Sequence, residues 1–386
     1  MRIYARRLLT EKGFVQNQVV EIKDGRIADI APGLDAPIRV DVLTPGLMDL
    51  HCHGGQGFSA RDNDLAAIKP FLDKMLSCGV TDFLMTISTG RREVMRHGLE
   101  ITRKAMQMQK EGKLGGARVL GAHLEGPFLS TARPGAMEAS AILRPGVESY
   151  EQFFAGYEDV IRMVTLAPEE EGAEELIHYL LTQGVCVQAG HTYAAYAEAA
   201  RAFETGVESL CHSFNACRGI HHREPGVVTA ALLQPHVYME AICDLVHLHP
   251  AILQLIYRTK GPDRMILISD SVATHGLPDG EYFAEGYDVI VKDGVSRTAD
   301  GALDGGGVYL DQAVRNIQSL GIPAEDAVKM ASSTPAARMR LSDSGSIETG
   351  KLAHLTGWDA QWQPVFTVLE DGMYTCGGEQ NANCRN

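Results

Sequence analysis

The sequence predicts an α/β protein, a (β/α)8 barrel beside a small β domain, and three observations carry this prediction. Eight short apolar runs punctuate residues 46–270, and segments with helical spacing separate them. Eight such units are the number that closes a parallel barrel. The two ends of the chain instead alternate apolar and polar residues, as half-buried antiparallel strands do. Finally, five of the eight runs end in a histidine or carboxylate, which indicates one shared site on the rim of the barrel.

The eight runs have the length and apolar content of strands buried on both faces. They cover residues 46–53, 79–87, 117–125, 160–167, 184–191, 207–212, 237–243 and 265–270. The segments with helical spacing cover residues 64–76, 92–110, 169–184, 193–206, 224–234 and 249–261. A hairpin at 281–298 and two helices, 307–320 and 323–332, are expected after the eighth strand.

The terminal segments predict a second, smaller unit. Residues 1–45 and 346–374 carry short alternating runs with glycine turns between them. Neither segment has enough strands to be stable alone. We therefore expect residues 1–45 and 346–386 to form one small β-sandwich domain, and residues 46–345 to form the barrel.

Composition narrows the class of protein. The formal net charge is −14 and no basic run occurs, which argues against a nucleic-acid surface. No apolar stretch approaches the roughly 20 residues that span a bilayer, and the N-terminus lacks a secretory signal. We expect a cytoplasmic protein that binds neither nucleic acid nor membrane. The eight cysteines include no CxxC pair, so reduced, mostly buried thiols are expected.

The residues that close the runs are those that bind metals. His51 and His53 stand two apart in the first strand, so both can face the barrel axis while Cys52 faces the helices. Glu125 closes the third strand, and His191 and His212 close the fifth and sixth. A Glu-His-His set is the pattern of catalytic zinc sites that leave one position for water. His123 shares the face of Glu125 and is expected to be a satisfied interior histidine.

Asp270 ends the eighth strand and is the natural general base. A bound metal lowers the pKa of water to about 7, and a nearby carboxylate can take the proton and return it. Asp270 could also touch the metal, and the sequence does not separate these roles.

Two loops are expected to hold the substrate. The loop 214–226 follows His212 and contains Asn215 and Arg223, a polar group and a fixed cation suited to phosphate or carboxylate. The loop 243–250 follows the seventh strand and offers His247 and His249. At the carboxyl end of a barrel both loops would overhang the metal.

Seven segments together resemble the amidohydrolase superfamily and, within it, the N-acetylglucosamine-6-phosphate deacetylase family. They are DLHCHG, HLEGPF, AGHT, CHSFNA, HHREPG, LISD with GLPDG, and GSIETGK, and the resemblance runs from about residue 3 to 374. It implies the barrel and the terminal β-sandwich, and usually a homodimer. It also implies a cofactor of one or two divalent metal ions, with zinc or iron as first candidates, and an amino-sugar phosphate as substrate.

The resemblance also implies roles for individual residues. Glu125, His191 and His212 match the main metal ligands, and Asp270 matches the catalytic acid and base. The pair His51 and His53 matches a second metal site found in some members. The positions that match contacts to the sugar phosphate or its acetamide, or the backbone that closes over it, are Asn215, Ala216, Arg223, His247, Leu303, Asp304 and Gly305.

The chain departs from the family pattern around the substrate. Met137 stands where the family usually has histidine, Leu245 where it has glycine, and His275 where a small residue is common. Asp304 and Gly306 replace the usual small residues of the closing segment. Met137 and Asp304 both disfavour the binding of a polar or anionic ligand. The metal ligands and the base match the family, so the departures leave only the exact substrate open.

The expected function is metal-dependent removal of an N-acetyl group, most directly from N-acetylglucosamine 6-phosphate, to give glucosamine 6-phosphate and acetate. Alternatives within the same chemistry are N-acetylgalactosamine 6-phosphate, an unphosphorylated acetamido sugar or an N-acyl amino acid. A further alternative is a barrel that has lost catalysis and serves as an interaction protein. Such proteins typically lose metal ligands, and this chain keeps all five.

Overall fold

The computed structural model describes residues 1–376, and the remaining polar segment, with Cys384, lies outside the described residues. Eight parallel strands form the predicted barrel, in the order β14-β13-β12-β11-β10-β9-β8-β5. Their bounds are β5 Leu47–Cys52, β8 Val80–Ser88, β9 Arg118–Glu125, β10 Ile161–Leu166, β11 Cys186–Ala189, β12 Ser209–Leu210, β13 Tyr238–Ile242 and β14 Met265–Ile268. Each observed strand lies within one residue of, or inside, a predicted run, which confirms the barrel.

Helices cover the outside of these strands, so the strands are buried on both faces and read as apolar runs. The α-helices are α1 Ile68–Ser77, α2 Arg92–Lys110, α3 Val147–Phe154, α4 Ala173–Thr182, α5 Tyr196–Glu204, α6 Val227–Leu233, α7 Pro250–Lys260, α8 Leu310–Ser319, α9 Ala324–Met330 and α10 Ser333–Arg338. Two short 3-10 helices span Leu65–Ala67 and Ala139–Ala141. Helices α3 and α10 were not predicted, because their eight and six residues are too few to display a clear helical period.

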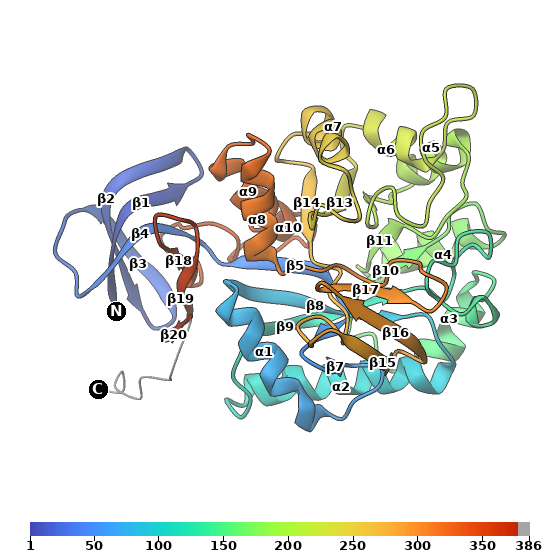
Figure 1. Ribbon diagram of the computed structural model, residues 1–386, viewed down its shortest axis with the longest axis horizontal. Helices are drawn as coiled ribbons and strands as arrows, with labels where there is room; N and C mark the ends of the chain where they lie inside the picture. Colours follow the sequence, from blue (N-terminus) through green and yellow to red (C-terminus); the bar gives the residue numbers. More distant parts are fainter. Residues whose placement is uncertain (377–386) are drawn as a thin grey trace.

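The two ends of the chain form one mixed sheet, with parallel and antiparallel strand pairs. It lies at the left of Figure 1, where the blue N-terminal strands lie beside the red C-terminal ones. Its order is β20-β19-β18-β4-β1-β2-β3. The strands are β1 Arg2–Thr10, β2 Gly13–Lys23, β3 Arg26–Pro32, β4 Ile38–Pro45, β18 His354–Trp358, β19 Pro364–Leu369 and β20 Gly372–Thr375. The sheet has its own apolar core, which includes Ile3, Val20 and Leu355. The domain boundaries at 45/46 and 345/346 stay a prediction.

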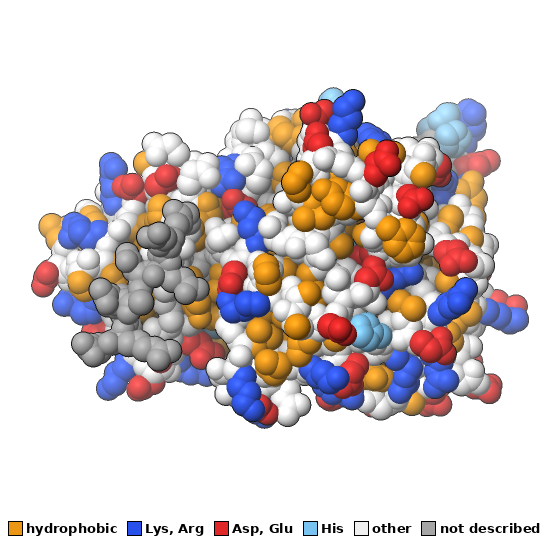
Figure 2. Space-filling view, turned by 60° about the horizontal axis from the view of Figure 1, so that its bottom comes forward, with side chains coloured by type: hydrophobic (Ala, Val, Ile, Leu, Met, Phe, Trp, Pro, Cys, Tyr) orange, Lys and Arg blue, Asp and Glu red, His pale blue; other side chains and the backbone are white. Residues whose placement is uncertain are grey.

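Two smaller sheets decorate the barrel. The predicted hairpin after the eighth strand is a three-stranded sheet, β15 Gly280–Ala284, β16 Tyr287–Lys292 and β17 Val295–Thr298. A two-stranded sheet, β6 Gly54–Gly55 and β7 Phe58–Ser59, follows β5 directly. Among the helices of residues 1–376, none combines the length and hydropathy that crossing a bilayer requires. On the face drawn in Figure 2, acidic and basic side chains are interspersed and neither sign forms a continuous stripe.

The barrel closes between β5 and β14 through backbone hydrogen bonds at the carboxyl ends of the two strands. The N–H of Asp270 donates to the carbonyl of His51 at 2.9 Å, and the N–H of His53 donates to the carbonyl of Ser271 at 2.8 Å. His51, His53 and Asp270, three of the predicted site residues, therefore lie at the junction of the first and last barrel strands. Backbone hydrogen bonds fix their relative positions directly.

A buried ion pair joins the barrel to the terminal sheet at the opposite end. Asp82 of β8 is 2% exposed and accepts from Nε of Arg118 at 2.6 Å and Nδ1 of His354 at 2.9 Å. Burial alone would raise the pKa of Asp82, but the charges of His354 and Arg118 outweigh it and hold this pKa well below its usual range.

We predict that Asp82→Asn lowers the free energy of unfolding by about 3–5 kcal/mol at pH 7, because it leaves the buried His354 and the partly buried Arg118 without their carboxylate. Since the folded-state pKa is depressed, this contribution is present above the unfolded pKa of about 3.9 and is lost as pH falls below it. Urea unfolding at several pH values measures both effects. Asp343→Asn, in an exposed pair with Arg26, is the control and should cost less than about 1 kcal/mol. An equal loss in both variants would contradict the prediction.

Candidate metal centre

Six side chains from five barrel strands meet at the carboxyl end of the barrel, and we call them the central cluster: His51, His53, Glu125, His191, His212 and Asp270. Each is at most 9% exposed. Glu125 is the last residue of β9, while His191, His212 and Asp270 each lie two residues beyond the end of their strand. The structure thus brings together every metal ligand and the base predicted from the sequence.

The backbone is left-handed at three of these positions. The φ angles are +45° at His191, +21° at His212 and +50° at Asp270, a region that non-glycine residues rarely occupy. Such conformations cost energy and persist where the surrounding structure imposes them, commonly at functional sites. Here they turn each side chain inward just after its strand ends.

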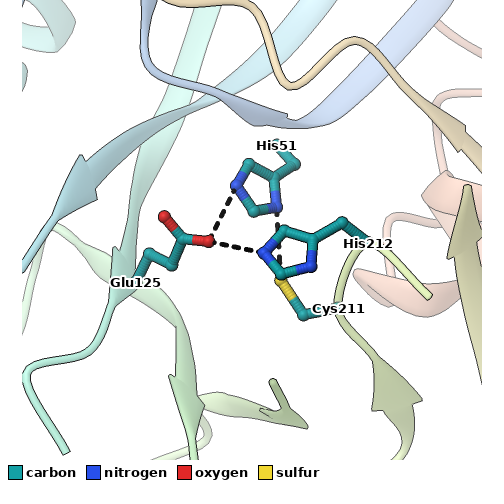
Figure 3. Close-up of side chains that lie close together, drawn as sticks. All are labelled: His51, Glu125, Cys211 and His212. Carbon is teal, nitrogen blue, oxygen red and sulfur yellow. Dashed lines mark hydrogen bonds and ion pairs between the residues drawn. The ribbon is translucent and has the colours of Figure 1, made fainter. Parts of the chain in front are cut away.

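Glu125 and two histidines form the first half of the cluster. Oε1 of Glu125 lies 3.1 Å from Nε2 of His191 and 2.9 Å from Nε2 of His212. The two Nε2 atoms are 3.1 Å apart. Figure 3 shows the carboxylate and the ring of His212 pointing toward each other, with His51 above them. One carboxylate oxygen and two imidazole nitrogens therefore surround a single point.

His51, His53 and Asp270 form the second half. Oδ1 of Asp270 lies 3.3 Å from Nε2 of His51 and 3.3 Å from Nε2 of His53. Glu125 reaches both histidines as well, at 3.4 Å from His51 and 3.3 Å from His53. Glu125 is therefore placed between the two halves: its Oε1 faces His191, His212 and His51, and its Oε2 faces His53.

The donor set and its spacing fit divalent metal ions. A tetrahedral site with zinc–nitrogen distances of about 2.0–2.1 Å separates its ligand atoms by about 3.3 Å. The ligand-atom separations within each half lie between 2.9 and 3.3 Å. Four imidazoles also aim Nε2 inward, which hydrogen bonding alone does not explain, because two facing nitrogens need one donor and one acceptor. These residues could hold one ion in each half.

The charges of the cluster favour ionised carboxylates. Burial alone would raise the pKa of Asp270, but the neighbouring His51 and His53 outweigh it and lower this pKa below the usual value. The same balance, with His51 as the largest opposing charge, holds the pKa of Glu125 well below its usual range. Asp270 is therefore a carboxylate at neutral pH, which is the form that accepts a proton.

His123 is a satisfied interior histidine, as its sequence position predicts. Its Nδ1 lies 3.1 Å from Oγ1 of Thr86, and its Nε2 lies 2.7 Å from Oγ1 of Thr165. Burial lowers the pKa of His123 well below its usual value, so the ring is neutral and supports the layer beneath the cluster.

Sequence reasoning missed two residues that touch the cluster from below. Sγ of Cys211 lies 3.4 Å from Nδ1 of His51, and Oε2 of Glu240 lies 3.5 Å from the same nitrogen. Figure 3 shows Cys211 beneath the rings of His51 and His212. The available signal for Glu240 was a lone carboxylate inside the apolar run HVYMEAIC.

The predicted substrate residues fall into two groups. Asn215 and Ala216 lie half-buried just after His212, and Nδ2 of Asn215 donates to the carbonyl of His212 at 3.2 Å. Arg223 instead lies on the exposed part of the same loop, where Nη1 donates to Nε2 of His222 at 2.7 Å. The structure brings Asn215 and Ala216 to the cluster, and it leaves Arg223 at the surface.

His247 is held by its own loop. Its Nδ1 donates to Oδ2 of Asp244 at 2.7 Å, and Oδ1 of Asp244 accepts from the backbone N–H groups of Val246 and His247. Burial alone would raise the pKa of Asp244, but the hydrogen bond and charge of His247 lower it to about 2. Leu245 has φ +64°, which a glycine adopts without strain, so this departure from the family pattern costs local energy.

The segment 303–307 packs directly against the base. The N–H of Gly306 donates to the carbonyl of Asp270 at 2.7 Å, and a Cβ at Gly306 would lie 1.9 Å from the carbonyl oxygen of Ser269. Asp304 is buried, and its Oδ1 accepts from the hydroxyl of Tyr287 at 2.6 Å. Burial raises the pKa of Asp304 to about 6.

The remaining departures lie on either side of the cluster. Met137 stands two residues after Gly135. A Cβ atom placed on Gly135 would lie 2.8 Å from Cε1 of His191, so the loop that carries Met137 contacts the cluster. His275 stacks on Tyr309 with ring centroids 4.1 Å apart, and its Nδ1 lies 2.8 Å from Oγ of Ser271. His275 is therefore joined to Ser271, the residue that follows Asp270, and packs on the ring of Tyr309.

Comparison with known proteins defines the class first. The model of the amidohydrolase family matches residues 42–376, nearly the whole of the chain. The chain belongs to the amidohydrolase family, whose members are hydrolases that generally use divalent metals.

Individual relatives are more specific. The chain is 35% identical over 363 residues to the N-acetylgalactosamine-6-phosphate deacetylase of Escherichia coli O157:H7, covering 92% of this chain and 94% of that protein. It is 35% identical over 360 residues to the N-acetylglucosamine-6-phosphate deacetylase of Vibrio furnissii, covering 91% and 89%. The structure of N-acetylglucosamine-6-phosphate deacetylase from Thermotoga maritima superposes with a TM-score of 0.86 at 31% identity, covering 97% and 99%. The resemblance seen in the sequence motifs is confirmed.

We predict that Zn²⁺ raises the thermal unfolding midpoint of the metal-free protein. An ion at about 100 times its dissociation constant stabilises the folded state by about 2.7 kcal/mol if the unfolded chain does not bind it. His191→Asn and His212→Asn should each remove most of this rise. His178→Asn, on the exposed face of α4, is the matched control and should keep it. A rise that survives both cluster variants would place the bound ion elsewhere.

Proposed function

We propose that this protein is a metal-dependent deacetylase of an amino-sugar phosphate, and that N-acetylglucosamine 6-phosphate is its first candidate substrate. The observation that carries the proposal is that Glu125, His191 and His212 surround one point, and that Nε2 of His51 lies between this group and Asp270, 3.4 Å from Glu125 and 3.3 Å from Asp270. The names of the relatives supply the substrate class. We further propose a cytoplasmic homodimer with zinc or iron as the metal.

We assign roles by contact within the cluster. Glu125, His191 and His212 would hold one divalent ion, and His51 and His53 would hold a second ion next to Glu125. A bound ion supplies Lewis-acid activation of water and of the acetamide carbonyl. Asp270 would take the proton of the attacking water, and its place 3.3 Å from Nε2 of both His51 and His53 supports this role.

The reaction then balances within the site. Asp270 removes a proton from water, and the hydroxide oxygen adds to the carbonyl carbon of the acetamide. The protonated Asp270 returns its proton to the nitrogen as the carbon–nitrogen bond breaks. The products are acetate and a free amino sugar. His247, oriented by Asp244, and the backbone near Ala216 and Leu303 to Gly305 would hold the substrate in place.

N-acetylgalactosamine 6-phosphate is the second candidate, and a specific observation favours it. The relative with that activity matches as well as the relative that acts on the glucosamine sugar, each at 35% identity. The two sugars differ only in the configuration of one hydroxyl, which groups such as Asp304 can distinguish by a hydrogen bond. Measured acetate release from both 6-phosphates, their unphosphorylated parents and a panel of N-acyl amino acids decides among these substrates.

We predict that Asp270→Asn keeps the ion held by Glu125, His191 and His212 and lowers turnover by at least about two orders of magnitude, the usual contribution of a positioned acid or base. The amide has the same shape but cannot accept the proton. Elemental analysis and acetate release measure the two quantities on the same sample. Asp288→Asn, on the exposed face of β16, is the control. Near-parental turnover of Asp270→Asn would reject the assignment of the base.

Arg223 lies on the exposed part of its loop, and its phosphate role rests on the family resemblance. We predict that Arg223→Ala raises KM strongly for a phosphorylated sugar and hardly for its unphosphorylated parent, because a guanidinium pairs with phosphate through two hydrogen bonds. Steady-state kinetics with both sugars tests this. The exposed Arg201→Ala on α5 serves as the control for loss of a surface cation. An equal change in KM for both sugars would show that Arg223 does not recognise the phosphate.

A further inference from the structure

Glu240 is a buried carboxylate that the proposed reaction does not use. It lies on β13 inside the barrel and is 1% exposed, beside Ile266 of the neighbouring strand. Within residues 1–376 its Oε1 has no hydrogen-bond partner. Burying a carboxylate costs folding free energy unless the carboxylate accepts a hydrogen bond or pairs with a cation. The groups that contact Glu240 therefore indicate what it does.

The other oxygen of Glu240 faces the floor of the central cluster. Oε2 lies 3.5 Å from Nδ1 of His51, 3.4 Å from the backbone nitrogen of His212 and 3.5 Å from Nε2 of Gln188. All three atoms can donate a hydrogen. Glu240 is thus an acceptor placed behind His51, on the side of the ring opposite the cluster.

The position of this acceptor matters because of the tautomers of histidine. Nε2 of His51 faces Glu125, Asp270 and His53, so it must carry a free lone pair to bind an ion. A neutral imidazole has one proton, which must then sit on Nδ1 and needs an acceptor. Metal-binding histidines usually donate that proton to a carboxylate or carbonyl, which fixes the ring and raises its basicity.

Cys211 offers Nδ1 a competing partner. Its Sγ is 3.4 Å away, and a thiol can donate as well as accept. If the thiol donated to Nδ1, the proton of His51 would sit on Nε2 and block the metal position. A carboxylate without a proton only accepts, so Glu240 favours the tautomer that binds metal.

The four histidines of the central cluster differ in the partner of their Nδ1 atom. Nδ1 of His191 donates to the carbonyl of Arg133 at 3.0 Å, while Nδ1 of His53 and of His212 has no partner within residues 1–376. Among the described residues, His51 alone has a carboxylate behind it. We propose that Glu240 is a positioning residue that holds His51 in its metal-binding tautomer and thereby retains a second ion between His51 and His53. This inference rests on the metal centre proposed above.

The test counts zinc ions bound to the full-length protein by equilibrium dialysis and elemental analysis. We expect two ions per chain in the parent and a dissociation constant for the weaker ion that rises about 10–100-fold in Glu240→Met, the usual cost of losing such a partner. The ion held by Glu125, His191 and His212 should keep its affinity. Methionine suits this variant because it is an unbranched side chain of similar length that lacks a carboxylate to accept the proton of His51.

Cys243→Ala removes a buried thiol whose Sγ donates to the carbonyl of Ala241; it is the control and should keep two ions because Glu240 remains. A parent that binds fewer than two ions, or a Glu240→Met variant that holds both with parental affinity, overturns the proposal. If Glu240→Met fails to fold, ¹H–¹⁵N correlation spectra of the zinc-loaded parent decide, with His51→Asn for assignment. Protonated Nδ1 supports the proposal, and protonated Nε2 overturns it.

The two proposals can fail separately. Zinc counts and spectra as expected, together with no acetate release from any sugar phosphate, would leave Glu240 in its role and reject the deacetylase function. If the protein releases acetate but binds a single ion that Glu240→Met does not affect, the deacetylase function stands and the role of Glu240 is rejected.

Discussion

The closure of a parallel barrel is the constraint on which the centre depends. Strands that are distant in sequence end on one ring, and β5 meets β14 there through bonds made by His51, His53, Asp270 and Ser271 themselves. The same backbone contacts that complete the sheet therefore set the spacing of the central cluster. A change in register between β5 and β14 would therefore displace His51 and His53 relative to Asp270.

Burying six ionisable groups in one place costs desolvation energy. Contacts within the central cluster and contacts in the layer of side chains below it offset that cost. Within the cluster, imidazoles face carboxylates and lower the pKa values of Glu125 and Asp270. Below it, His123 is satisfied by two threonine hydroxyls, and Glu240 faces His51. The arrangement is costly without a cation, because several nitrogens point at one another, and a divalent ion resolves that conflict.

The substrate side of the site is more particular to this chain. Met137, Leu245, His275 and Asp304 all depart from the family pattern, and each lies on a loop that touches the cluster or its supports. Loops at the carboxyl end of a barrel can change without disturbing the strands that hold the chemistry. This separation explains how metal ligands and base stay intact while the choice of sugar stays open.

The sequence by itself determined the eight strands, the small sheet made from both ends, and the six residues of the central cluster. It did so because strands buried on both faces read as apolar runs, and polar residues at their ends stand out. Only the tertiary structure decided which atoms face each other. The left-handed backbone at His191, His212 and Asp270, the exposed position of Arg223, and the place of Glu240 and Cys211 beneath His51 depend on contacts between distant strands. A pattern of spacing in one strand contains no information about the strand that lies across the barrel.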